Sequence, residues 1–132
     1  MPVNADEMKA RILIIDDEPM IRWSIAQTLQ AAGHEVTVCE TAAEGMELFR
    51  AVQPDVALVD LRLPDANGAT VVEAMQSENT RRTAVIVMTA FDEDCSPEAA
   101  RRLGAVDYIR KPFDFEGLED IVDKALQTRL GT

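Results

Sequence analysis

A run of four apolar residues that ends in a carboxylate constrains the fold most. Residues 56–59 read Val-Ala-Leu-Val, and Asp60 follows directly. Turn-forming residues lie on both sides, with Pro54 before the run and Leu-Pro-Asp-Ala-Asn-Gly at 63–68 after it. A short apolar run between turns is typical of a strand buried on both faces. Asp60 then lies where a strand ends, which in open α/β sheets is the edge that binds ligands. The alternative is that Asp60 is only the first loop residue.

Four further segments rich in apolar residues predict four more strands, at residues 12–15, 36–39, 84–88 and 106–109. A helical pattern follows each of the five strands; the helices begin at Pro19, after Thr41, at Ala69, at Pro97 and after Asp114. The chain therefore reads as (βα)5, a doubly wound α/β sandwich with helices on both faces of a parallel sheet. Strand order 2-1-3-4-5 is the common arrangement for this number of strands.

Polar residues follow several of these strands. Asp16 and Asp17 come after the first strand, Asp60 after the third, Thr89 after the fourth and Lys111 after the fifth. Strand order 2-1-3-4-5 brings all of them to one edge of the sheet. Taken singly, each has an ordinary explanation: acids at a helix N-terminus, a strand-end threonine, a surface lysine. Their coincidence at one edge favours a functional site.

Such a site suits a phosphoryl group and a cation. Three carboxylates held close together raise the pKa of at least one of them. A hard divalent cation relieves this repulsion, and Mg²⁺ usually takes one or two carboxylates and keeps water ligands. A lysine and a threonine hydroxyl at the same edge would help to stabilise a phosphoryl group on a carboxylate oxygen.

Composition narrows the remaining possibilities. The chain of 132 residues is long enough for one domain, and its net charge of -11 argues against direct nucleic-acid binding. No apolar run is long enough for a membrane span, and the acidic N-terminus does not fit a signal peptide. The two cysteines show no metal or redox spacing. We expect a cytoplasmic domain at 11–128, a loose tail at 1–10, and at 129–132 a chain end or the start of a linker.

Three local details carry expectations of their own. Trp23 is off the apolar stripe of its helix and should be partly exposed. His34 follows a glycine in a loop and should be solvated. Gly45 lies inside a helix at a cost of about 1 kcal/mol against alanine, which a close approach of helix and sheet would explain.

Motifs along the chain, most of them at this edge, resemble those of the receiver domains of bacterial two-component response regulators. The matching residues are Asp16 and Asp17, Asp60, Leu63, Pro64 and Gly68, Thr89 and Ala90, Gly104 and Ala105, Tyr108, and Lys111, Pro112 and Phe113. The resemblance covers residues 11–127 and implies a flavodoxin-like fold.

The resemblance also implies a set of roles at the acidic edge. Asp60 accepts a phosphoryl group from a sensor histidine kinase. Mg²⁺ (or Mn²⁺) binds Asp17, Asp60 and the backbone carbonyl of Arg62, and Asp16 contacts it through water. The domain is then a phosphoacceptor and not a turnover enzyme, apart from self-phosphorylation by small donors and slow autodephosphorylation.

Further roles fall on the last two strands. The resemblance implies that Thr89, Ala90 and Lys111 contact the phosphoryl group and that the bond before Pro112 is cis. Thr89 and Tyr108 switch position, which changes the surface of the fourth helix, fifth strand and fifth helix. We expect that surface to form a homodimer on phosphorylation.

Two residues are expected to slow hydrolysis of the phosphorylated state. Arg62 and Phe91 lie two positions after Asp60 and Thr89, and both are bulky. They should border the path of an attacking water, which must lie in line with the leaving oxygen. Neither is suited to orient that water.

The class of regulator and the alternatives remain open at this point. Ile-Arg-Trp at 21–23 and Met-Thr-Ala-Phe at 88–91 resemble receivers of enhancer-binding activators, which would make this chain the receiver of a longer transcription regulator. A stand-alone receiver is the alternative. A Mg²⁺-dependent phosphohydrolase is a further alternative. Such enzymes usually have a second aspartate, the general acid, two residues after the nucleophile, and this chain has Arg62 at that position. A nucleotide- or flavin-binding module is the last alternative. It would need a glycine-rich phosphate loop after the first strand, where this chain has an acidic segment at residues 16–18. Pro97 departs from the family pattern and predicts a late, short fourth helix.

Overall fold

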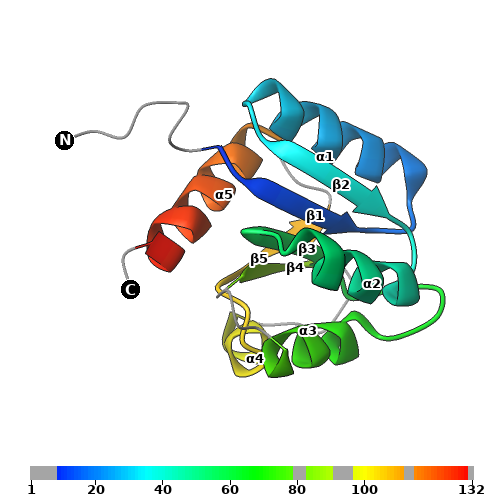
Figure 1. The fold of residues 1–132 in the computed structure, drawn as a ribbon. Helices are drawn as coiled ribbons and strands as arrows, with labels where there is room; N and C mark the ends of the chain where they lie inside the picture. Colours follow the sequence, from blue (N-terminus) through cyan, green and yellow to red (C-terminus); the bar gives the residue numbers. More distant parts are fainter. Residues whose placement is uncertain (1–8, 79–82, 91–96, 112–114, 131–132) are drawn as a thin grey trace.

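The computed structural model describes residues 9–78, 83–90, 97–111 and 115–130 (Figure 1). Five strands form one sheet in the order β2-β1-β3-β4-β5. The strands are β1 (Arg11–Ile15), β2 (Glu35–Cys39), β3 (Val56–Asp60), β4 (Ala84–Ala90) and β5 (Asp107–Lys111). All neighbouring pairs are parallel, so the predicted (βα)5 topology and strand order are confirmed.

Helices alternate with the strands and cover both faces of the sheet (Figure 1). They are α1 (Pro19–Ala31), α2 (Ala42–Val52), α3 (Gly68–Ser77), α4 (Pro97–Arg102) and α5 (Phe115–Leu130). α1 and α5 pack on one face, and α2, α3 and α4 pack on the other. Within the described ranges, no helix combines the length and apolarity that a membrane crossing requires.

The apolar runs are continuous because each strand is buried on both faces. In β1, Ile12 and Ile14 pack under α1 and α5, whereas Leu13 and Ile15 pack under α2. β3 alternates in the same way, and each of its residues is buried. This alternation fixes the face on which each strand-end side chain emerges, because successive side chains point to opposite faces.

Local sequence signals set the helix ends. Pro19 begins α1, and Gly33 ends it with a φ of +99°, as expected for a left-handed cap. The Thr41 hydroxyl accepts a hydrogen bond from the backbone N–H of Glu44 and caps α2. α4 begins at Pro97, as the sequence predicted. The predicted caps at Ser96 and Asp114 lie outside the described residues.

Gly45 lets α2 pack closely against β1. A Cβ atom at this position would lie 2.4 Å from the Cδ1 atom of Ile15, which is far inside van der Waals contact. The close approach proposed from the sequence is therefore confirmed, and it explains why a poor helix former is kept inside α2.

β4 and β5 extend further toward the carboxyl edge than their apolar runs predicted. Thr89 pairs with Arg110 and Ala90 pairs with Lys111, so these residues belong to the ladder. The ends that the apolar content predicted for both strands were too early, because a strand that ends at a functional site carries polar side chains there. Thr89 and Lys111 are consequently held by strand hydrogen bonds.

His34 is buried, and the expectation that it is solvated was wrong. Only 8% of the residue is exposed, and its Nδ1 atom accepts a 3.1 Å hydrogen bond from the backbone N–H of Ala10. Ala10, which we placed at the end of the loose tail, is itself buried and accepts a hydrogen bond from the backbone N–H of Glu35. Trp23 is 61% exposed, as predicted.

His34 should make stability depend on pH near neutrality. Burial lowers the pKa of this imidazole, and the charges of Asp123 and Glu119 offset part of that effect. An unfolded histidine, with its pKa near 6.5, then binds a proton before the folded one does. The stability that His34 contributes is therefore full above about pH 6.5 and is lost as pH falls below it.

The His34→Ala variant measures this contribution. We expect it to unfold about 1–3 kcal/mol more easily at pH 7.5, because the N–H of Ala10 loses its buried acceptor. Urea unfolding of wild type and variant should show that difference shrinking between pH 7.5 and pH 5.5. A difference that stays constant over this range would contradict the assignment.

Candidate functional site

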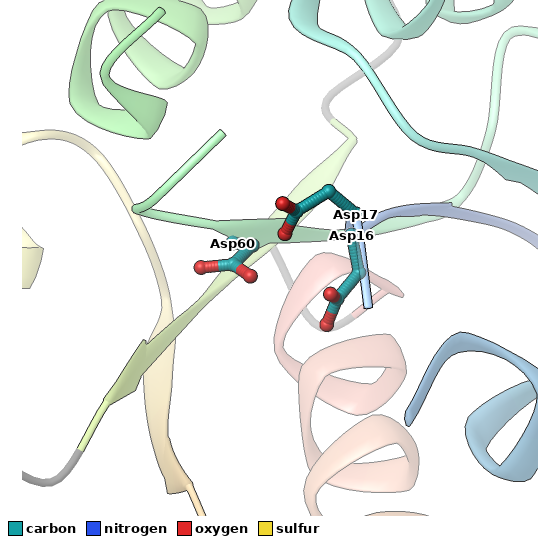
Figure 2. A group of neighbouring side chains, drawn as sticks. All are labelled: Asp16, Asp17 and Asp60. Atoms are coloured by element: carbon teal, nitrogen blue, oxygen red, sulfur yellow. The ribbon is translucent and has the colours of Figure 1, made fainter. Parts of the chain in front are cut away.

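Three carboxylates meet where β1 and β3 end. Asp16 and Asp17 follow β1, and Asp60 is the last residue of β3, its parallel neighbour. One ligand oxygen from each carboxylate lies within 4.8 Å of the others, and the side chains gather around one space (Figure 2). Asp16 and Asp60 are buried, whereas Asp17 is exposed. The sequence prediction that these acids converge is thus supported by the geometry.

Lys111 lies among these acids at the end of β5. Its Nζ atom donates hydrogen bonds to Asp16 Oδ2 at 2.6 Å, to Asp60 Oδ2 at 2.9 Å and to Glu18 Oε1 at 3.1 Å. Its side chain is only 8% exposed. An ammonium group has three N–H donors, so the three carboxylates use all of them.

The network holds Lys111 as a cation. Burial alone lowers the pKa of Lys111, but hydrogen bonds and charge attraction from Asp16 and Asp60 raise it above its ordinary value. Burial raises the pKa of Asp16, and hydrogen bonds from Lys111 and the backbone N–H of Glu18 offset part of this. The buried charges are kept because they are paired with one another.

Backbone N–H groups fix the other oxygens of the two buried acids. Asp60 Oδ1 accepts a 2.9 Å hydrogen bond from Arg62, and Asp16 Oδ1 accepts one of 2.9 Å from Glu18. Each carboxylate therefore has one oxygen on Lys111 and one on its own loop. This arrangement gives both groups a single defined orientation.

The loop after β3 is anchored to two helices. A Cβ atom on Gly68 would lie 2.2 Å from the backbone oxygen of Asp60, so only glycine lets the start of α3 pack against the strand end. Asp65 accepts hydrogen bonds from the backbone N–H groups of Ala42 and Ala43 at the start of α2. Those two hydrogen bonds lower the pKa of Asp65.

Thr89 lies at the same edge, and its hydroxyl is one of the buried groups of the site. The residue is fully buried, and none of the groups that the structure describes forms a hydrogen bond with its Oγ1 atom. A buried hydroxyl without a partner costs about 1–3 kcal/mol, so this one is available to a ligand or a water molecule at the site. Tyr108 is half-buried on the face covered by α3 and α4.

A pocket of about 350 Å³ opens beside the carboxylates. It is lined by Asp17, Glu18, Asp60, Arg62, Leu63, Pro64 and Lys111. Sequence reasoning gave no role to Glu18, although it follows Asp16 and Asp17 directly. The predictions for Phe91 and Pro112 lie outside the described residues.

The donor set fits a hard divalent cation. Only carboxylate oxygens come together here among the described residues, with no histidine or cysteine among them. Mg²⁺ and Mn²⁺ prefer such oxygens, whereas zinc sites use nitrogen and sulfur. Asp17, the exposed member of the three-carboxylate group, borders the pocket and is therefore accessible to an ion entering from solvent.

Fold and site together define a parallel α/β domain whose acidic pocket encloses a buried lysine at the carboxyl edge of the sheet. The chain belongs to the response regulator receiver domain family, whose model matches residues 12–123. The family and the flavodoxin-like fold that the sequence motifs implied are thereby confirmed.

The match covers nearly all of one relative but only about a quarter of two others. The chain is 40% identical over 117 residues to regulatory protein AtoC of Escherichia coli K12, which is 89% of this chain and 25% of AtoC. It is 34% identical over 118 residues to protein PilH of Pseudomonas aeruginosa PAO1, covering 89% of this chain and 98% of PilH. It is 32% identical to the DNA-binding transcriptional regulator NtrC of E. coli K12 over 87% of this chain, but only 24% of NtrC.

Solved structures show the same architecture. NtrX from Brucella abortus superposes with a TM-score of 0.85 at 26% identity, covering 92% of this chain and 28% of NtrX. A CheY-like receiver domain protein from Methanospirillum hungatei superposes with a TM-score of 0.83 at 29% identity, covering 93% of this chain and 98% of that one.

Proposed function

We propose that this domain is a phosphorylation switch in which Asp60 accepts a phosphoryl group from a sensor histidine kinase. The observation that carries the proposal is the Asp60 carboxylate itself. It borders an open pocket, yet Lys111 and the N–H of Arg62 hold it in one orientation. A carboxylate oxygen attacks phosphorus, and the bond from phosphorus to the donor breaks with its electron pair leaving on the donor.

A divalent cation is part of the proposal. Asp16, Asp17 and Asp60, with the backbone carbonyl of Arg62, would hold Mg²⁺ or Mn²⁺, Asp16 through water. The bound ion would neutralise charge on the phosphoryl oxygens. Lys111 would supply a fixed positive charge to the same oxygens.

The same geometry suggests how the switch operates. The Thr89 hydroxyl, with no described partner, can turn to a phosphoryl oxygen, which would also contact the backbone at Ala90. Tyr108, on the same face of the sheet, would then change rotamer. This alters the surface formed by α4, β5 and α5, because a new charge biases a two-state element.

Transcription control is the output we infer. AtoC and NtrC are named as a regulatory protein and a DNA-binding transcriptional regulator, and this chain matches about a quarter of each. We propose that it serves as the receiver of such a regulator, with an output domain beyond it. The match to nearly all of PilH favours a stand-alone receiver as the second candidate.

Phosphoryl uptake tests the proposed function. Wild type incubated with acetyl phosphate and Mg²⁺ should gain one phosphoryl group by intact-mass measurement, and the adduct should map to the peptide that contains Asp60. Excess EDTA should prevent it, and hydroxylamine should remove it, because an acyl phosphate reacts with that nucleophile. An adduct located on any other peptide would rule out the assignment.

Arg62 is proposed to prolong the phosphorylated state. Its exposed side chain lines the pocket, and its guanidinium can reach a phosphoryl oxygen. Replacing it by asparagine should speed loss of the adduct, and Arg62→Asn/Phe91→Glu should speed it further, on the order of tenfold. The measurement is adduct decay by intact mass after the donor is removed. A double variant that decays no faster than wild type would exclude this gating role.

Phosphorylation is also proposed to cause dimerisation through α4, β5 and α5. Arg101, Arg102 and Arg110 are exposed on this surface together with Glu119 and Asp120, so opposite charges can pair across a two-fold axis. Sedimentation with Mg²⁺ and beryllofluoride should show a doubled mass at tens of micromolar, the order of magnitude for weak partners. The Arg110→Glu variant should stay monomeric. An unchanged mass in wild type would contradict dimerisation.

A further inference from the structure

We propose that Glu18 is a positioning residue that holds Lys111 in the resting domain and releases it to an incoming phosphoryl oxygen. The inference rests on the proposed phosphorylation of Asp60 and adds a residue that limits its rate. It begins with the third hydrogen bond of Lys111, which runs from Nζ to Glu18 Oε1 at 3.1 Å.

Glu18 occupies a capping position without acting as a cap. It is the N-cap residue of α1, but its side chain makes no capping hydrogen bond. Thr41 and Asn67, at the same position of α2 and α3, each accept one from the first turn of their helix. The carboxylate of Glu18 turns to Lys111 instead. Asp16 Oδ1 accepts the backbone N–H of Glu18 and thereby holds the residue near the lysine.

Exposure decides which partner Lys111 can give up. With all three N–H donors in use, a phosphoryl oxygen must replace one acceptor. The side chain of Asp16 is fully buried and that of Asp60 is 5% exposed, whereas that of Glu18 is 56% exposed. Before the phosphoryl group is transferred, while Asp60 is still a carboxylate, releasing either buried acid leaves an unpaired charge in the interior, but Glu18 can be hydrated at the mouth of the pocket.

The charge of Glu18 acts in the same direction. It lines the pocket through which a phosphodonor enters, so a carboxylate at this point repels an anionic donor. Removing the charge weakens the hydrogen bond from Lys111, because a neutral amide oxygen is a poorer acceptor than a carboxylate, and it also weakens the repulsion, while Asp16 and Asp60 keep the lysine in place. Both effects make phosphoryl uptake faster.

The Glu18→Gln variant tests the inference through phosphoryl uptake. With saturating Mg²⁺, and acetyl phosphate kept in the range where the rate rises linearly with its concentration, the uptake rate of the variant should exceed that of wild type about fivefold, the scale of one unit charge a few ångströms away in water. The excess should shrink as salt is raised from 0.05 to 0.5 M, values that span strong to weak screening. Glu47→Gln removes an exposed acid on α2, away from the pocket lining, and should behave as wild type.

A second readout needs no phosphodonor. The sequence contains three lysines, Lys9, Lys111 and Lys124, so side-chain ammonium signals in ¹⁵N-lysine spectra are few. The Lys111 signal should shift and exchange faster with water in Glu18→Gln, and should not change in Glu47→Gln. If both variants match wild type in spectrum and uptake rate, the inference is refuted and the proposed function stands. If wild type takes up no phosphoryl group, both are refuted.

Discussion

Asp60→Asn should take up no phosphoryl group. An amide has no anionic oxygen to attack phosphorus, yet it has nearly the shape of the carboxylate and its oxygen can still accept the N–H of Arg62. Lys111 retains Asp16 and Glu18 as partners, so the fold should survive. Intact mass after incubation with acetyl phosphate and Mg²⁺ should show only unmodified protein. Among single substitutions in this chain, we expect this one to have the largest effect on phosphoryl uptake.

Glu47→Gln is the control, because it also exchanges a carboxylate for an amide, on the exposed surface of α2 and away from the proposed dimer surface. It should be phosphorylated at the wild-type rate. The two variants should also melt close to wild type, which would show that the loss in Asp60→Asn is chemical. Uptake at the wild-type rate by Asp60→Asn would overturn the assignment of Asp60.

Lys111→Met should lower the free energy of unfolding by about 3–5 kcal/mol at neutral pH without metal. Methionine fills a similar volume but leaves the buried carboxylates of Asp16 and Asp60 beside each other with no cation. Mg²⁺ should restore much of the stability, because an ion bound by these acids supplies the missing charge. Urea unfolding with EDTA and with millimolar Mg²⁺ measures both effects.

The control for this variant is Lys124→Met, which removes an exposed lysine from α5. It should change stability by no more than about 0.5 kcal/mol, with or without Mg²⁺. If Lys111→Met were as stable as Lys124→Met in EDTA, the buried ion pairs would not contribute as the geometry indicates.

The main elements could be predicted because two simple signals agree. Apolar runs such as residues 12–15 and 56–59 mark strands buried on both faces, and parallel strands share one carboxyl edge. That rule is sufficient to gather Asp16, Asp60 and Lys111 from positions far apart in the chain. The ends of β4 and β5 were missed, since Thr89 and Lys111 are polar and the site, not the core, determines their character.

The features that could not be predicted depend on contacts between residues that the sequence pattern does not reveal. His34 is buried because a backbone N–H 24 residues earlier donates to it, and nothing near His34 indicates this. Glu18 contacts Lys111 because of one side-chain rotamer at a helix start. Gly68 was assigned to a turn and to the family motif, but its close approach to the backbone of Asp60 was not predicted.

The order of the strands along the chain has a consequence for synthesis of the protein on the ribosome. Asp60 precedes Lys111 by 51 residues, so every acid of the site is synthesised long before the lysine that neutralises it. β1 and β3 can pair as soon as both have emerged, which brings Asp16 and Asp60 together without a counter-charge. Neutralisation of these acids by Lys111 must then wait for β5, which is the last of the five strands to be synthesised and lies at the edge of the sheet.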